Sequence, residues 1–250
     1  LTPYQETETS LLVRAQESVA LDRLGSIRSP LSPTLSPGSG ERGRDLRGVT
    51  VVATPRALFR RLPPPRDFAA AVLEVRPGQD HTLEELAARL TRFGFRRTDL
   101  VYEVGDFAVR GGILDLFPPG EDSPVRLDFF GDTVESIRWF DPHSQRSEDT
   151  LDSVRILPLY LFPGGAGEAA QLAQLLAGRT GPDLGPEAAA LLEALRARGG
   201  FPGWENYLPL LADETAGLAG MLDNPLVWAV DPPALDAEVI AIADAGYRAL

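Results

Sequence analysis

The chain has 250 residues, of which 44% are apolar and 24% are charged, with a net charge of −12 and no cysteine. This length admits one large domain or two to three small ones, and the apolar content is sufficient for a sizeable core. The acidic balance argues against an autonomous DNA-binding domain, and the lack of cysteine excludes disulfides and thiolate metal sites and is typical of a reducing cytosol.

All 24 basic residues are arginine, because the sequence contains no lysine. A Walker A phosphate-binding loop requires a lysine, so this segment is not expected to bind a nucleotide cofactor or to hydrolyse ATP. The two histidines, His81 and His143, stand apart from each other, and we expect no metal site. No apolar run approaches the ~20 residues that crossing a bilayer requires, so we expect a soluble protein without catalytic residues.

Two features open the chain. Apolar residues recur at close to helical spacing over residues 10–27, and this pattern predicts one amphipathic helix. Residues 29–44 are rich in serine, proline and glycine, with the Ser-Pro dipeptide repeated. This composition buries too little apolar area to order itself, so we predict a disordered surface insertion.

A strand followed by a capped helix is predicted next. Residues 49–53 have the pattern of a buried strand, and Thr54 with Pro55 is an N-cap followed by proline at the first helical position. The helix is expected to end near Arg61, ahead of three prolines, and residues 69–75 are predicted to form another strand. This order is typical of one βα unit of an α/β sheet.

The middle of the chain has the strongest strand signal. Thr82 with Glu85 is a capping box that opens a helix to about Phe93. After it, β-branched and aromatic runs alternate with Gly-Gly, Pro-Pro-Gly and Gly-Asp turn signals, which predicts an antiparallel meander packed against that helix. The predicted strands are residues 99–104, 107–110, 113–117, 125–130 and 134–140. Residues 70–158 are expected to form a compact α+β module.

Alternation along the fourth of these strands separates two sets of side chains. Leu127 and Phe129 share the face that belongs in a core, whereas Arg126, Asp128 and Phe130 share the other face. An exposed aromatic side chain next to an arginine is typical of a protein-binding surface. The alternative at this point is a phenylalanine half covered by a loop or by the next strand.

Beyond residue 158 helices are predicted to dominate. The expected elements are helices at residues 166–178 and 187–198, a short helical segment at 204–211, a buried strand at 226–230 and a last helix from Pro233. Helices around a strand indicate a return to the α/β sheet of the first part. Trp204 and Tyr207 are interpreted as core residues rather than as a platform for stacking bases.

The strand-rich region resembles a known family. The resemblance is carried by residues 110–118 (RGGILDLFP), 126–132 (RLDFFGD) and 137–141 (IRWFD), which are similar to the module shared by the bacterial UvrB and transcription-repair coupling factor (Mfd) families. In both families this module docks onto UvrA. The positions that the resemblance implies for UvrA contact are Arg110, Arg126 and Phe130, all three of which keep the family's residue type.

The resemblance covers nearly the whole chain except residues 29–44, and it implies an α/β fold of two interleaved parts. A degenerate RecA-like, helicase-type domain would be interrupted by a small α+β module with an antiparallel sheet. Residues 1–69 would form the first part of the RecA-like domain, residues 70–158 the UvrA-binding module, and residues 159–250 the second α/β part.

The implied function is binding rather than catalysis: the segment recruits UvrA and so links stalled RNA polymerase to nucleotide excision repair. The full-length parent would be an ATP- and Mg-dependent DNA translocase of the bacterial cytoplasm that contacts RNA polymerase and DNA through other domains. Its C-terminal domain would cover the UvrA-facing surface. Two alternatives are a fragment of UvrB, the ATP-dependent helicase-like subunit, and a purely structural domain. The absence of lysine and of a tyrosine-rich hairpin before the first helix counts against UvrB.

Overall fold

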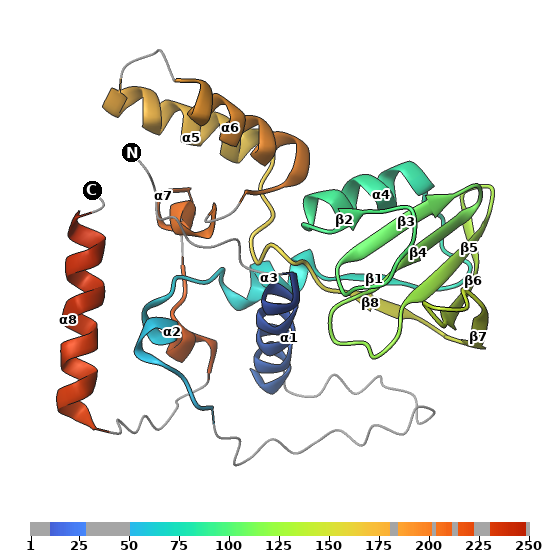
Figure 1. Ribbon diagram of the computed structural model, residues 1–250, viewed down its shortest axis with the longest axis horizontal. Coiled ribbons are helices and arrows are strands. Elements are labelled where there is room, and N and C mark those ends of the chain that lie inside the picture. Colours follow the sequence, from blue (N-terminus) through green and yellow to red (C-terminus); the bar gives the residue numbers. More distant parts are fainter. Residues whose placement is uncertain are drawn as a thin grey trace.

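The computed structural model describes residues 11–28, 51–180, 185–201, 204–211, 215–222 and 231–248. Its helical elements are α1 (Leu11–Arg28), α2 (Pro55–Phe59), α3 (Pro65–Ala71), α4 (Leu83–Arg92), α5 (Ala166–Thr180), α6 (Pro186–Arg198), η1 (Trp204–Tyr207), α7 (Leu208–Leu211), η2 (Leu218–Met221) and α8 (Pro232–Arg248). Its strands are β1 (Leu73–Val75), β2 (Arg96–Arg97), β3 (Asp106–Arg110), β4 (Ile113–Leu116), β5 (Val125–Phe130), β6 (Thr133–Phe140), β7 (Ser147–Thr150) and β8 (Val154–Ile156). The fold is mixed α/β, with the sheet at one side of the molecule and α8 at the other (Figure 1).

Strands β2 to β7 form one six-stranded sheet in sequence order, antiparallel throughout except for the parallel pair β2–β3. The predicted strands β3, β4, β5 and β6 are confirmed, whereas the strand predicted at residues 99–104 is wrong. These residues turn because the buried Asp106 carboxylate accepts the backbone N–H groups of Tyr102 at 3.4 Å and Glu103 at 3.1 Å. A side chain that satisfies local backbone donors competes with strand pairing.

The inner face of this sheet packs against α4 and makes the main core. The predicted N-cap is confirmed, because Thr82 Oγ1 accepts the backbone N–H of Glu85 at 3.1 Å. Alternate residues of β3 to β6 point inward, as the pattern predicted. The core includes Leu86, Leu90, Phe107, Leu114, Leu116, Leu127, Val134 and Ile137, and Phe129 packs against its margin. The other face of the sheet carries a smaller buried cluster of Val101, Ala108 and Phe140.

The region before the sheet differs from the prediction in two places. Residues 51–53 are not a strand, and residues 69–71 end helix α3 rather than begin a strand, which is confined to β1. Pro65 at the first position of α3 explains the helix, since proline there is pre-organised and loses no hydrogen bond. Strand β1 pairs antiparallel with β8, so it extends the module rather than a RecA-like sheet. The RecA-like assignment stays a prediction.

Several predictions fall on residues that the structure does not describe. The insertion at 29–44, the segment before residue 11 and the strand at 226–230 all lie outside the described residues. Within the described part, the first helix is confirmed as α1, and the helix after Thr54 is confirmed as α2, which ends at Phe59 instead of Arg61. No described helix combines the length and apolar character that crossing a membrane requires.

The helices predicted after the sheet are confirmed, and α5, α6, η1 and α7 form a second core. Helices α5 and α6 pack together at the top of Figure 1. Trp204 is fully buried in the core cluster that includes residues of both helices. Its indole N–H donates to the carbonyl oxygen of Phe162 at 2.8 Å, and its ring lies against those of Phe162 and Phe201. The interpretation of Trp204 as a core residue, rather than a base-stacking one, is therefore confirmed.

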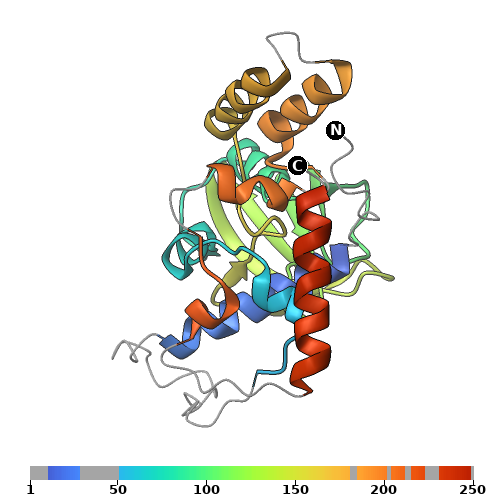
Figure 2. The same ribbon diagram turned by 90° about the vertical axis from the view of Figure 1, so that its left-hand side faces the viewer.

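Helix α1 joins the sheet module to the rest of the chain. The hydroxyl of Ser18 donates to the carbonyl oxygen of Pro158 at 2.7 Å, and Arg155 forms an ion pair with Asp22 at 2.7 Å. Figure 2 shows α8 standing across the front of the other elements, on the side away from the sheet. The outer face of the sheet is thus left free of these helices.

Gly199, at the end of α6, is expected to tolerate no side chain. Its φ is +77°, and a Cβ placed on it would lie 2.1 Å from the carbonyl oxygen of Arg92. We expect Gly199→Ala to lower the free energy of unfolding by about 2 kcal/mol or more, because backbone strain and the clash add. Gly111→Ala is the control, since Gly111 has φ +59° with nothing within 4 Å. Equal losses in chemical denaturation would contradict this account of the α4–α6 contact.

Candidate protein-interaction face

The outer face of the sheet brings the polar side chains of neighbouring strands into register. Asp115 of β4 lies opposite Arg126 of β5, which in turn lies opposite Arg138 of β6. Residues directly opposite each other on one face are close enough for their side chains to interact. The face therefore collects charged groups in a row across three strands, as alternation predicted for Arg126.

Asp115 is the centre of this face. It is 1% exposed and accepts hydrogen bonds from both arginines of the predicted site: Arg126 Nε at 2.7 Å, Arg126 Nη2 at 2.9 Å and Arg110 Nη2 at 2.6 Å. A buried carboxylate is tolerated where such charge-assisted bonds satisfy its oxygens. Asp115 is not among the predicted site residues, because no local pattern shows that it lies opposite Arg126.

Arg126 is largely committed to contacts within the chain. Its side chain is 13% exposed and lies 4.8 Å above the ring of the buried Phe140. Besides binding Asp115 at both oxygens, it donates from Nη1 to the carbonyl of Gln145 at 3.3 Å and to Ser147 Oγ at 3.5 Å. Its hydrogen bonds to Asp115 raise the pKa of Arg126 above its ordinary value, against the effect of burial. Arg126 thus links β4, β5 and the β6–β7 turn, and most of its donors are already bound within the chain.

Arg110 is placed differently. Its side chain is 45% exposed, and Nη2 alone contacts the described residues, donating to Asp115 and to Gln145 Oε1 at 3.3 Å. Among the described residues, no partner takes the hydrogens of Nε and Nη1. Anchored at one nitrogen, this guanidinium is pre-organised and still able to form a second hydrogen-bonded pair.

Phe130 is the exposed apolar residue of the face. It is 81% exposed at the end of β5, where it lies opposite Thr133 just before the Gly131 turn. A bulge between Asp128 and Phe129 shifts the β5–β6 register immediately before it. Bulges re-aim side chains at strand ends. The alternative of a ring half covered by a loop or strand is therefore wrong.

The turn between β6 and β7 closes the network around both arginines. Gln145 has a left-handed φ of 59°, accepts from Arg110 through Oε1 and from Arg126 through its carbonyl, and donates from Nε2 to the carbonyl of Pro142 at 2.7 Å. A non-glycine residue in this conformation needs surrounding contacts to stay there. Sequence reasoning missed Gln145, because a glutamine between two polar residues carries no pattern.

This turn is expected to respond to acid. The backbone N–H of Ser144 donates to Asp141 Oδ1 at 2.6 Å, and this bond lowers the pKa of Asp141 below 3.8. Because its pKa is lowered in the folded chain, the Asp141 carboxylate stabilises the turn fully at pH values above its ordinary pKa. This stabilisation is lost as the pH falls through the lowered pKa of the folded state. The amide NMR signal of Ser144 should therefore titrate with a midpoint below 3.8. In the Asp141→Asn variant this titration should vanish, and its persistence would contradict the assignment.

The described residues contain no group of three or more histidine, cysteine or acidic side chains placed to bind a metal ion. The face combines a buried carboxylate, two arginines that this carboxylate orients, and one exposed aromatic ring. Nothing in it is arranged as a nucleophile with its base. Arginine and aromatic side chains are the residues that most often anchor protein interfaces.

Comparisons with known proteins find matches to the part of the chain that forms this face. Residues 73–162 match the family of the UvrB interaction domain. A transcription-repair-coupling factor of Myxococcus xanthus is 38% identical over 199 residues, which is 77% of this chain and 16% of the relative. The corresponding values are 32% over 205 residues for the factor of Rickettsia bellii, covering 81% and 17%, and 38% over 117 residues for that of Escherichia coli, covering 47% and 10%.

The chain thus spans about a sixth of the length of the Myxococcus xanthus and Rickettsia bellii factors. The matched relatives bear the name of the coupling factor, which does not favour the alternative of a UvrB fragment. The chain is a member of the transcription-repair-coupling factor family over one segment of that protein, and its residues 73–162 are a UvrB interaction domain.

Proposed function

We propose that the outer face of the sheet binds UvrA, and that the chain recruits UvrA to link stalled RNA polymerase to nucleotide excision repair. The observation that carries the proposal is Phe130, an apolar ring 81% exposed on the same sheet face as two oriented arginines. Aromatic and arginine side chains are the residues that most often anchor interfaces. The match of this module to the UvrB interaction domain and the name of its relatives support the choice of partner.

In this proposal the three predicted residues have separate roles. Phe130 fills an apolar depression on UvrA, and Arg110 donates from Nε and Nη1 to a carboxylate beside that depression. Arg126 has a supporting role without direct contact to UvrA, because its donors already bind Asp115, Gln145 and Ser147. In the proposed interface Arg126 therefore contributes mainly by holding Asp115 and the β6–β7 turn in place.

The wider role belongs to the proposed full-length parent. It would use ATP and Mg for DNA translocation in the bacterial cytoplasm and contact RNA polymerase and DNA through other domains. The residues flanking the module would be a degenerate RecA-like domain without a nucleotide site. A C-terminal domain of the parent would cover the UvrA-facing surface, so the isolated segment would bind UvrA more readily than the parent.

A binding titration against UvrA from the same source tests the proposal. The unmodified chain should bind, and a variant that lacks the Phe130 ring should bind far more weakly. If the unmodified chain does not bind, the proposal fails and the alternative of a purely structural domain gains support. Equal affinities of the segment and its full-length parent would count against covering of the face by the C-terminal domain.

A further inference from the structure

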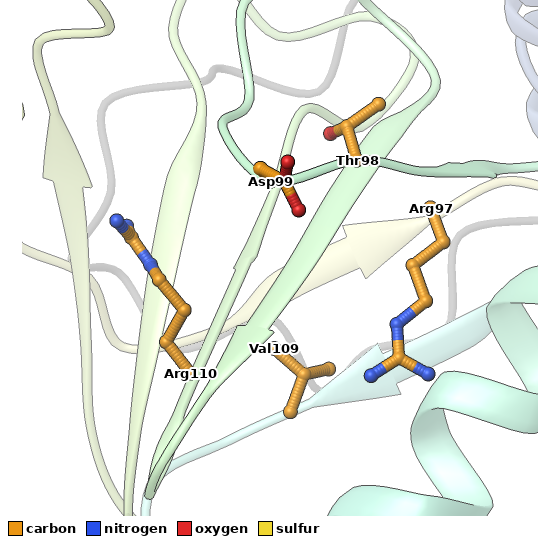
Figure 3. A pocket seen from close by; sticks show the side chains of 5 residues that line it. All are labelled: Arg97, Thr98, Asp99, Val109 and Arg110. Carbon is orange, nitrogen blue, oxygen red and sulfur yellow. The ribbon is translucent and has the colours of Figure 1, made fainter.

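The open edge of the sheet has a hollow next to Arg110. Strand β2 stops pairing with β3 after Arg97, and the chain then turns away from the sheet. The hollow that results is lined by Arg97, Thr98, Asp99, Val109 and Arg110. In Figure 3 the side chains of Arg97 and Arg110 lie on either side of Val109, with Asp99 across the hollow from them.

The backbone of Val109 faces this hollow. The N–H of Phe117 donates to the carbonyl of Asp106 across the β3–β4 pair, so every second residue of β3 from Asp106 bonds to β4. Phe107 and Val109 therefore turn their backbone groups to the opposite edge, where the carbonyl of Phe107 accepts the N–H of Thr98 at 2.8 Å. No described residue takes the N–H or C=O of Val109, which leaves that N–H as a donor at an open strand edge.

The donors around the hollow match one kind of ligand. Arg97 is exposed and forms no ion pair with any described residue, and Arg110 keeps Nε and Nη1 without a described partner. Two guanidinium groups flanking a backbone N–H fit a carboxylate, which accepts several hydrogen bonds at its two oxygens. The phosphates of a nucleic acid fit less well, since Asp99 lines the same hollow and the chain carries a net charge of −12.

We infer that this hollow receives one acidic side chain of UvrA, bound between Arg97 and Arg110 with the Val109 N–H as a third donor. The inference rests on the proposed function, because Arg110 also belongs to the Phe130 face. The register places Arg110 two strands away from Asp128, with Phe130 two residues further along β5. Strand spacing and rise put Arg110 roughly 12 Å from Phe130, so one interface of ordinary size covers both.

The test is a titration of UvrA with four charge variants of the chain. Arg97→Gln is expected to weaken binding about tenfold, because it removes a charge-assisted hydrogen bond. Asp99→Asn is expected to strengthen binding severalfold, since it removes the carboxylate that repels the incoming acid. Arg198→Gln on α6 and Asp152→Asn after β7 carry the same charge changes at exposed positions that form no ion pair with any described residue, and should leave the affinity unchanged.

The outcomes separate this inference from the function on which it rests. Opposite shifts for the Arg97 and Asp99 variants, with unchanged controls, would establish the acidic side chain in the hollow. If the chain binds and loses affinity without the Phe130 ring while both hollow variants match the parent, the inference is wrong and the proposed function stands. If each hollow variant and its control change the affinity for UvrA equally, the change arises from net charge alone, and the inference is also wrong.

Discussion

Phe130→Ala is expected to weaken the binding of the chain to UvrA by roughly thirtyfold or more. Truncating an aromatic anchor at the centre of an interface typically costs ~2 kcal/mol or more, and 1.4 kcal/mol corresponds to a factor of ten. The ring is 81% exposed in the free chain, so its removal leaves the packing of the sheet intact. The affinity is measured by isothermal titration calorimetry with UvrA from the same source.

Two controls make this result specific. The free energy of unfolding of Phe130→Ala should stay within about 0.5 kcal/mol of the parent, as for other exposed positions. Ile240→Ala removes a comparably exposed apolar side chain from α8, far from the sheet, and should leave the affinity for UvrA unchanged. Similar losses for Phe130→Ala and Ile240→Ala would show that exposed apolar area alone, rather than this face, drives the binding.

Asp115→Ala is expected to destabilise the folded chain by about 3 kcal/mol or more. The substitution leaves Arg126, only 13% exposed, without the carboxylate that binds its Nε and Nη2. Removing one partner of a buried ion pair typically costs ~3–5 kcal/mol, because the remaining charge is uncompensated. Chemical denaturation measures this loss. Asp128→Asn, at a carboxylate of the same face that is 25% exposed, should cost far less.

A double-mutant cycle shows whether the ion pair is the cause. Asp115→Asn and Arg126→Gln should each lower the free energy of unfolding, and the double variant should lose clearly less than the sum of the two. Additive losses would mean that Asp115 and Arg126 act independently, against the geometry. Arg110 should contribute less to the affinity for UvrA when Asp115 is substituted, since that carboxylate holds its guanidinium in place.

The sequence predicted the elements that follow simple periodicities. Strands β3 to β6, helix α4 with its Thr82 cap, and helices α5 and α6 lie close to where their patterns placed them. Alternation along β5 also assigned Leu127 to the core and Phe130 to the opposite face. These features depend on neighbours in the chain, so local spacing contains the information.

The elements that were missed depend on contacts between distant residues. Residues 99–104 have strand composition, but the Asp106 carboxylate draws them into a turn. Strand β1 pairs with β8 some eighty residues away, and no local pattern predicts that partner. Prolines 63–65 were interpreted as the end of a helix, although Pro65 begins α3.

The candidate site was predicted in part for the same reason. Family resemblance and alternation pointed to Arg110, Arg126 and Phe130, but the sequence gives no sign that one carboxylate, Asp115, binds both arginines. The sequence also does not show that Arg126 donates a hydrogen bond to Gln145 in the β6–β7 turn. The division of roles between the two arginines arises from burial, which only the assembled sheet determines.

Hydrogen–deuterium exchange of the chain, with and without UvrA from the same source, tests the central claim most directly. We expect slower exchange on binding at Phe130 and the β5–β6 turn and around Arg110, with unchanged exchange in α5, α6 and α8. Protection at the sheet would locate the interface on the face that carries the buried Asp115. Protection confined to the helices, or none at UvrA concentrations that saturate binding, would contradict the account.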